Sequence, residues 1–358
     1  MGFLVDVPSI AADDTPQWRE RRAIVMKWAR ALEKTSFHAC MVYAYESVGR
    51  CNADLSHPVH AIALTDEIPD TADLLERYPG EVWEIDNVYS RAEFWIAMTQ
   101  YSATAPLKIA AAWYGFRAVT MPGFTQAMMP ALAIDVAVIE SRVSKLASAL
   151  TNAHTAVLNF DVDGRNYALT LDLRYRMGFA QSGRYTRNGQ VGNLPSGEAY
   201  IVPYEGEKIG IISTTDGILP IEHKGKVALC EISENRIVCI DGDNDWANGL
   251  REWIAVDPTR SNVAELGFGI LGEWGIESVG HPLLDEKLAP HIALGRSEHL
   301  GGVTSPADFK THATACHVDY IYHRSIMSHV RIVRASLLFD DRPECVFMAN
   351  DRYCWDDL

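Results

Sequence analysis

The chain is short of basic residues and of long apolar runs. Among its 358 residues, 47 are acidic and 32 are basic, which gives a net charge of −15. A surface that binds nucleic acid needs a basic field, and so does attraction to anionic membranes. The composition therefore disfavours both, and we expect the partner to be a small molecule or a short peptide.

Other absences narrow the class further. No apolar run approaches the length of a membrane span, and the first residues have no basic region followed by a long apolar core, as a signal peptide would. The seven cysteines are odd in number and scattered, with no CxxC, which is typical of reduced thiols. We therefore expect a cytoplasmic protein. GxGxxG and Walker A sequences are also missing, so nucleotide binding has little support.

The first part of the chain alternates between helical and strand-like patterns. Residues 16–35 have helical spacing, 38–47 and 58–64 resemble buried strands, and 81–88 alternates less clearly. We predict a helix over 91–102 and a strand over 107–115. Strands that alternate with helices predict an α/β fold with a mostly parallel sheet.

The composition changes near residue 154, after the longest helical pattern, residues 125–153. We predict an N-terminal α/β domain over 1–154 and a β-rich, mixed α+β, metal-binding catalytic domain over 155–358. The second domain opens with a hairpin turning at Asp163 and Gly164, and it contains a short helix over 243–256. Its further strands are predicted at 198–206, 208–215, 226–232, 236–242, 291–295, 317–323, 330–339 and 345–351.

Side chains suited to a divalent metal gather in the second domain. His317 and Asp319 are two residues apart, so on a strand they point to the same face. Imidazole nitrogen and carboxylate oxygen are common ligands of divalent metals. Glu265 lies in an otherwise apolar, glycine-rich run, where an unpaired carboxylate would be costly to bury. These residues predict a metal site, although an HxD pair alone is a weak signal.

Several short motifs follow one another in a fixed order: MPGFT at 121–125, NLPSGE ending in Glu198, NVAELGFG around Glu265, DEK at 285–287, HIALG from His291, GG at 301–302, and HVD at 317–319. With them, the chain from about residue 120 resembles the aminopeptidase T family of metallopeptidases. The resemblance implies a homodimer and a two-metal site. Its metal ligands would be Glu198, Glu265, His291, His317 and Asp319, with Glu198 and Glu265 also catalytic.

Three carboxylates and two imidazoles are more than one catalytic ion normally takes while it keeps an open position. They suit two ions about 3.5–4 Å apart, and we expect zinc, cobalt or manganese. One carboxylate could instead be the general base, and the residues leave that choice open.

The chain departs from the family at one position. The family carries a tyrosine shortly after the histidine of HIALG, where this chain has Glu298 and His299. We predict that these two residues contact substrate, together with Arg174, which could pair with a substrate carboxylate.

Three functions are compatible with this ligand set. The first is a metal-dependent hydrolase that cleaves an amide bond of a peptide or a small molecule. The second is an Fe(II) dioxygenase that opens a hydroxylated aromatic or pyridine ring, because the superfamily that the chain resembles also contains 2,5-dihydroxypyridine 5,6-dioxygenase. A triad of His291, His317 and Asp319 could bind its single ion. The third is metal binding without catalysis. Glu265 and His291 have the peptidase-like identity, which favours the hydrolase.

Overall fold

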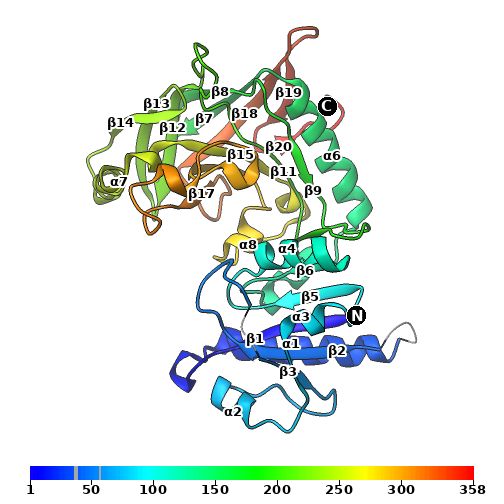
Figure 1. Ribbon diagram of the computed structural model, residues 1–358. Coiled ribbons are helices and arrows are strands. Elements are labelled where there is room, and N and C mark those ends of the chain that lie inside the picture. The colour runs from blue at the N-terminus through cyan, green and yellow to red at the C-terminus, as the bar shows by residue number, and fades with distance from the viewer. Residues whose placement is uncertain (36–38, 56–57) are drawn as a thin grey trace. The chain divides into compact units, whose positions relative to one another are not determined.

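The computed structural model describes residues 1–35, 39–55 and 58–358. By their internal contacts these form two compact units (Figure 1). Unit 1 contains Met1–Ala133 and Gly183–Ser196, and unit 2 contains Ile134–Ser182 and Gly197–Leu358. The boundary at residue 154 stays a prediction. Helix α6 (Val136–Asn152), which precedes it, packs on strands β9 and β11 of unit 2.

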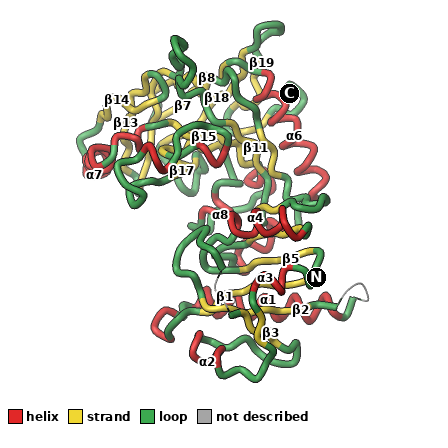
Figure 2. Tube along the Cα trace, viewed as in Figure 1, coloured by secondary structure: helices red, strands yellow, loops and turns green. Residues whose placement is uncertain are grey.

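Unit 1 is built on a seven-stranded, mostly parallel sheet, which confirms the predicted α/β class. Figure 2 shows that this unit contains both helices and strands. The pairs β1–β2, β1–β5, β5–β6 and β6–β10 are parallel, whereas β2–β3 and β3–β4 are antiparallel. The strands in sheet order are β10 (Val191–Asn193), β6 (Arg117–Thr120), β5 (Phe94–Met98), β1 (Gly2–Val7), β2 (Met41–Glu46), β3 (Val59–Ile62) and β4 (Val82–Trp83).

The helices of unit 1 include α1, which confirms the pattern at 16–35. It begins after Thr15, whose side chain accepts a hydrogen bond from the Trp18 amide. The strands predicted at 38–47 and 58–64 are also confirmed as β2 and β3, except that residue 38 lies outside the described residues. The helices are α1 (Pro16–Glu33), α2 (Ala72–Glu76), α3 (Ile85–Tyr89), α4 (Thr104–Tyr114) and α5 (Met129–Leu132).

Two predictions in unit 1 were wrong: a predicted helix is a strand, and a predicted strand is a helix. Residues 91–102 contain strand β5 instead of a helix, because four of its five residues are buried in a parallel sheet and read as a continuous apolar run. Residues 107–115 belong to helix α4 instead of a strand. That segment is rich in alanine, and its helix ends at Gly115 in the left-handed conformation, with φ of 74°.

Unit 2 is the β-rich α+β part that the sequence predicts, with two sheets. The turn between β7 and β8 lies at Asp163 and Gly164, with φ of 48° and 84°, which confirms the hairpin. The eight-stranded sheet runs β14 (Arg236–Asp241), β13 (Lys226–Ser233), β12 (Asp216–His223), β8 (Arg165–Asp172), β7 (Thr155–Val162), β18 (Val330–Leu338), β19 (Cys345–Ala349) and β20 (Arg352–Tyr353).

The five-stranded sheet carries the predicted metal ligands. Its order is β17 (His317–Ile321), β16 (Pro290–Gly295), β15 (Val263–Gly269), β11 (Glu198–Ile201) and β9 (Phe179–Gln181). One face packs toward the other sheet, where Phe268 meets Phe347 edge to face at 4.9 Å. Glu265, the predicted metal ligand on β15, lies on the opposite face, because side chains alternate along a strand.

Outside the sheets, unit 2 contains α6, α7 (Asp245–Val256) and α8 (Pro282–Asp285). Helix α7 confirms the prediction at 243–256, and α6 forms the main part of the helical pattern at 125–153. The strand predicted at 208–215 was wrong. This segment is a loop in which Gly210 has a φ of 77° and Ile209 is fully exposed, so the apolar run is not buried.

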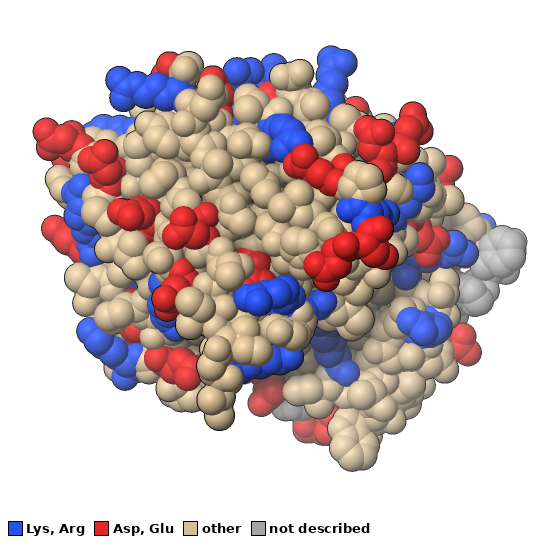
Figure 3. Space-filling model, turned by 90° about the horizontal axis from the view of Figure 1, so that it is seen from above, with Lys and Arg blue, Asp and Glu red and all other residues tan. Residues whose placement is uncertain are grey.

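No helix in the described part of the chain is long and apolar enough to cross a membrane. The face seen in Figure 3 shows acidic and basic side chains interspersed. The homodimer, the cytoplasmic location and the class of partner stay predictions.

Candidate metal centre

The register of the five-stranded sheet places the five predicted ligands on one face. Residues directly opposite each other on antiparallel strands point to the same side. Glu265 pairs with Ala293, which pairs with Asp319, and Gly267 pairs with His291. The same face also carries Glu198, which lies opposite Gly269, and His317, which lies opposite Gly295. Small residues therefore alternate with the ligands and leave them room to converge.

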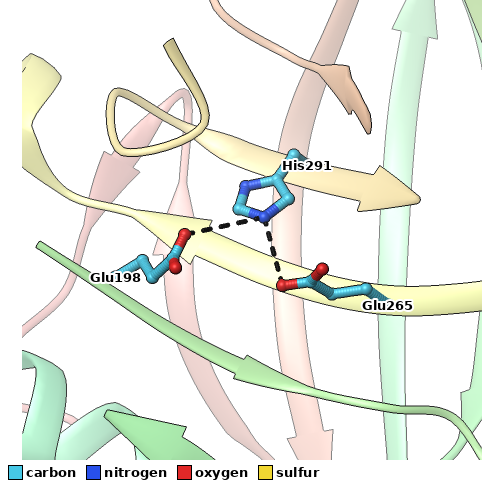
Figure 4. Close-up of side chains that lie close together, drawn as sticks. All are labelled: Glu198, Glu265 and His291. Atoms are coloured by element: carbon cyan, nitrogen blue, oxygen red, sulfur yellow. Dashed lines mark ion pairs between the residues drawn. The ribbon is translucent and has the colours of Figure 1, made fainter. Parts of the chain in front are cut away.

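The five side chains form two groups that share Glu265. One contains Glu198, Glu265 and His291, and the other contains Glu265, His317 and Asp319. In each group, one potential ligand atom per residue lies within 4.8 Å of the others. In the first group, His291 Nε2 lies 3.5 Å from Glu265 Oε1 and 3.8 Å from Glu198 Oε2 (Figure 4). We call these two groups the 198 site and the 319 site.

Both imidazoles are oriented by the backbone. His317 Nδ1 donates to the carbonyl oxygen of Arg296 at 2.7 Å, which turns Nε2 toward Glu265 Oε2 at 3.1 Å. His291 Nδ1 points in the same way at the Ala289 carbonyl, at 3.3 Å. A carbonyl oxygen can only accept, so each Nδ1 carries a proton and each Nε2 faces the carboxylates. Histidine ligands of metals are commonly fixed by such a bond.

Two carboxylate oxygens of the cluster are buried without a hydrogen-bond partner among the described residues: Glu198 Oε2 and Asp319 Oδ1. Each belongs to a different site. Among the described residues, the His317 ring is the one group in ion-pair range of Asp319 Oδ1, at 3.4 Å. A buried acceptor without a donor is costly, and a cation satisfies it. The residues present therefore fit a divalent metal.

Gly267 is needed beside His291. A Cβ atom at this position would lie 2.0 Å from His291 Nε2, because the ring crosses directly over the glycine. A side chain there would push the imidazole away from Glu265. The glycine lies in the NVAELGFG motif, so the sequence contained the signal for this constraint.

Sequence reasoning gave no role to Lys287, which contacts the cluster. Its side chain is 2% exposed, and Nζ donates to Glu198 Oε1 at 2.5 Å and to Glu286 Oε1 at 2.6 Å. Burial acts to lower the pKa of Lys287, but attraction by these two carboxylates overrides it and raises the pKa. The available signal was the DEK motif and a lysine placed between apolar segments.

The other shifts show a cluster rich in negative charge. Burial raises the pKa of Glu198 despite the attraction of Lys287. It also raises the pKa of Glu286 to about 7, to which the charges of Glu198 and Asp319 contribute. Burial opposes the charged form of His291, but its bond to Glu265 raises the pKa to about 9. Burial also opposes the charged form of Glu265, but the hydrogen bonds from both imidazoles outweigh it and lower the pKa of Glu265.

Of the predicted substrate residues, His299 lies beside the cluster. Its ring meets that of His317 edge to face at 5.0 Å. Burial, and then the nearby His317, lower the pKa of His299 to about 4, so it is neutral at pH 7. Glu298 instead pairs with Arg296, whose Nε donates to both of its oxygens, at 2.7 and 2.8 Å.

The loop that carries His299 is held by a buried carboxylate that sequence reasoning also missed. Glu205 accepts hydrogen bonds from the Ser297 hydroxyl at 2.7 Å, the Val303 amide at 2.7 Å and the Thr304 hydroxyl at 2.6 Å. Arg176 pairs with the same carboxylate. Glu205 thereby fixes both ends of the loop next to the cluster.

Arg174 is engaged away from the ligand set. It donates to both oxygens of Asp172, at 2.9 and 2.6 Å, and to the Ile212 carbonyl at 3.1 Å. Its substrate role stays a prediction, and these contacts describe a structural ion pair.

No family model and no curated protein matches the sequence. Among solved structures, the chain is similar to a 2,5-dihydroxypyridine dioxygenase from Pseudomonas putida KT2440, with a TM-score of 0.59 and 15% identity over 98% of this chain and 91% of that one. It is also similar to wild-type AmpT from Thermus thermophilus, with a TM-score of 0.52 and 12% identity over 98% and 94%. At these identities the likeness concerns the fold, and at that level it confirms the resemblance found in the sequence.

Proposed function

We propose that the protein is a metal-dependent hydrolase that cleaves an amide bond of a peptide or a small molecule. Its two divalent ions would be held by the 198 site and the 319 site. The observation that carries the proposal is the shared carboxylate: Glu265 Oε1 faces His291 and Oε2 faces His317. A carboxylate whose oxygens face two separate ligand groups suits a pair of ions.

The distribution of the imidazoles supports two ions over one. A mononuclear Fe(II) oxygenase site takes two histidines and one carboxylate on a single ion. Among the described residues, each of the two groups compact enough for one ion contains one imidazole. The ring-opening dioxygenase is nevertheless the second candidate, because a protein of that name shares the fold over 98% of this chain.

The bound ions would polarise the scissile carbonyl and lower the pKa of a bound water. In this proposal, Glu198 and Glu265 serve as ligands. Glu286 lies outside both ligand groups, its side chain is 20% exposed, and Lys287 Nζ holds its Oε1 beside Glu198. We assign Glu286 as the general base.

Glu298 and His299 stand where the resemblance leads one to expect a tyrosine, and of the two we assign His299 the substrate role, because Glu298 pairs with Arg296. The neutral ring of His299 can donate one hydrogen bond and accept another, and it lies against His317. In this proposal His299 binds a polar group of the substrate next to the ions.

The proposal is tested by restoring activity with metal. Protein stripped with a chelator is loaded without oxygen with Zn²⁺, Mn²⁺, Co²⁺ or Fe²⁺. Each sample is then assayed for cleavage of dipeptides and amino-acid anilides, and for oxygen uptake with hydroxylated pyridines and aromatic acids. We expect amide cleavage with Zn²⁺, Mn²⁺ or Co²⁺. Oxygen uptake that depends on Fe²⁺, with no amide cleavage, would establish the second candidate instead.

A further inference from the structure

Lys287 contacts one of the two sites through a fixed geometry. Within the described residues, the hydrogen bonds of its Nζ go to Glu198 and Glu286. Its backbone is held as well: the Lys287 carbonyl accepts from the Leu271 amide at 2.8 Å. A Cβ atom on Gly269, the residue opposite Glu198, would lie 2.3 Å from the Lys287 carbonyl carbon. The side-chain and backbone contacts of Lys287 therefore fix the position of its ammonium group on this face of the sheet.

This ammonium limits how Glu198 can bind an ion. Oε1 already accepts from Lys287 at 2.5 Å, whereas Oε2 is the oxygen without a hydrogen-bond partner and lies 3.8 Å from His291 Nε2. Glu198 can thus offer one oxygen to a metal while Lys287 stays bound. The positive charge next to that oxygen also repels a divalent ion, and in a buried site the repulsion is weakly screened.

The 319 site has a different environment. Glu265 Oε2 and Asp319 Oδ1 both face His317 Nε2, at 3.1 and 3.4 Å. Among the described residues no lysine or arginine pairs with these two oxygens, and His317 becomes a metal ligand once its Nε2 is deprotonated, so no fixed positive charge opposes a divalent ion here.

We propose that Lys287 makes the two metal sites unequal, so that the 319 site fills first and tightly and the 198 site fills second and more weakly. The inference rests on the proposed function, because it requires two ions. It implies that the second ion exchanges with solution while the first stays bound.

The experiment is a titration of metal-free protein with Zn²⁺, in which binding is measured by calorimetry. The titration is repeated with a chelator that competes for Zn²⁺. We expect two binding events in the wild type, with Kd values that differ by about tenfold or more. Glu198→Gln should remove the weaker event, and Asp319→Asn should remove the tighter one. If Glu198→Gln removes the tighter event, the proposed order of filling is wrong.

Lys287→Met tests the cause of the difference. It should tighten the weaker event by about tenfold or more, because it removes the charge and frees Glu198 Oε1. The tighter event should stay within about threefold. Lys287→Arg is the matched control: it keeps the charge and should keep the difference. An unchanged or lost weaker event in Lys287→Met would overturn the inference. If that variant does not fold, the Glu198 and Asp319 variants still decide the order.

The two proposals fail in different ways. A wild-type protein that binds one Zn²⁺ contradicts the two-metal function and the inference together. A wild-type protein that binds two ions of equal affinity, or whose affinities do not respond to Lys287→Met, contradicts only the inference.

Discussion

Each unit buries a cluster of charged side chains, but the two clusters differ in what they leave unsatisfied. In unit 1, Asp6 and Arg21 are 2% and 1% exposed. Asp6 Oδ1 accepts from the Trp18 indole at 3.2 Å and from the Gln100 amide at 2.9 Å. The buried atom without a partner there is Arg21 Nε, a donor. In unit 2, the corresponding atoms are Glu198 Oε2 and Asp319 Oδ1, both acceptors.

The difference separates a structural cluster from a candidate metal centre. Burial raises the pKa of Asp6, although the charge of Arg21 and the hydrogen bonds from Trp18 and Gln100 act to lower it. The unit 2 cluster combines the carboxylates of Glu198, Glu265 and Asp319 with one ammonium and two imidazoles that are neutral when they act as ligands. Buried charge alone is therefore a poor indicator of a metal site. A surplus of acceptors oriented toward one point is a better one.

The largest effect is expected from removing a central ligand. Glu265→Ala or His317→Ala should lower kcat/KM by at least about 10³-fold, because the shared carboxylate or its imidazole partner is lost. Circular dichroism should show a folded protein in both cases. Full activity in either variant would remove the metal-site interpretation.

The structural cluster should respond in stability instead. Asp6→Asn removes the charged acceptor of the Trp18 indole and the Gln100 amide and the charge that attracts Arg21, and the free energy of unfolding should fall by about 1–3 kcal/mol, as urea titration can measure. The metal content per folded chain should not change. A loss of metal in this variant would mean that the two clusters are coupled, contrary to the comparison.

Gly267→Ala should damage the metal centre without altering any ligand. The added Cβ would displace the His291 ring, and metal affinity should fall by about 10–100-fold. Gly249→Ala is the matched control. Gly249 lies in helix α7 with open space around it, so alanine should stabilise the protein by about 0.5–1 kcal/mol and leave metal affinity unchanged. Equal metal affinity in the two variants would contradict the role given to Gly267.

The smallest effect concerns Arg174. Burial acts to raise the pKa of Asp172, but its bonds from Arg174 and from backbone amides lower it overall. The stabilisation is then present above the unfolded-state pKa of about 3.9 and is lost as the pH falls through the lower folded-state value. Arg174→Met should lower the free energy of unfolding by roughly 1 kcal/mol at pH 7 and by less below about pH 4. KM should change by less than about threefold; a large rise in KM would restore Arg174 as a substrate residue.

Much of the candidate site could be predicted from the sequence, because several of its side chains obey local rules. Strand alternation placed His317 and Asp319 on one face, and the cost of a lone carboxylate singled out Glu265. Glu198 depended on the family resemblance, since a glutamate after a turn is ordinarily exposed. Lys287 was missed because its partner Glu198 lies 89 residues earlier. The local signal, a lysine in the DEK motif between apolar segments, gives no indication of that partner.

The fold was predicted where periodicity is clear and missed where apolar residues occupy both faces of an element, buried as in β5 or exposed as Ile109 and Trp113 are in α4. Helix α1 and the β7–β8 hairpin have one apolar face each. Strand β5 and helix α4 are both short and apolar, so the pattern alone could not assign them. The return of residues 183–196 to unit 1 depends on the pairing of β10 with β6, a contact between distant segments.

The central claim is that two ions share Glu265, and the metal content per chain tests it most directly. Protein purified without oxygen and without chelator is measured by elemental analysis, beside Glu265→Ala. We predict near two Zn, Mn or Co per wild-type chain and one or fewer in the variant. One Fe per wild-type chain would contradict the account and support a ring-opening dioxygenase.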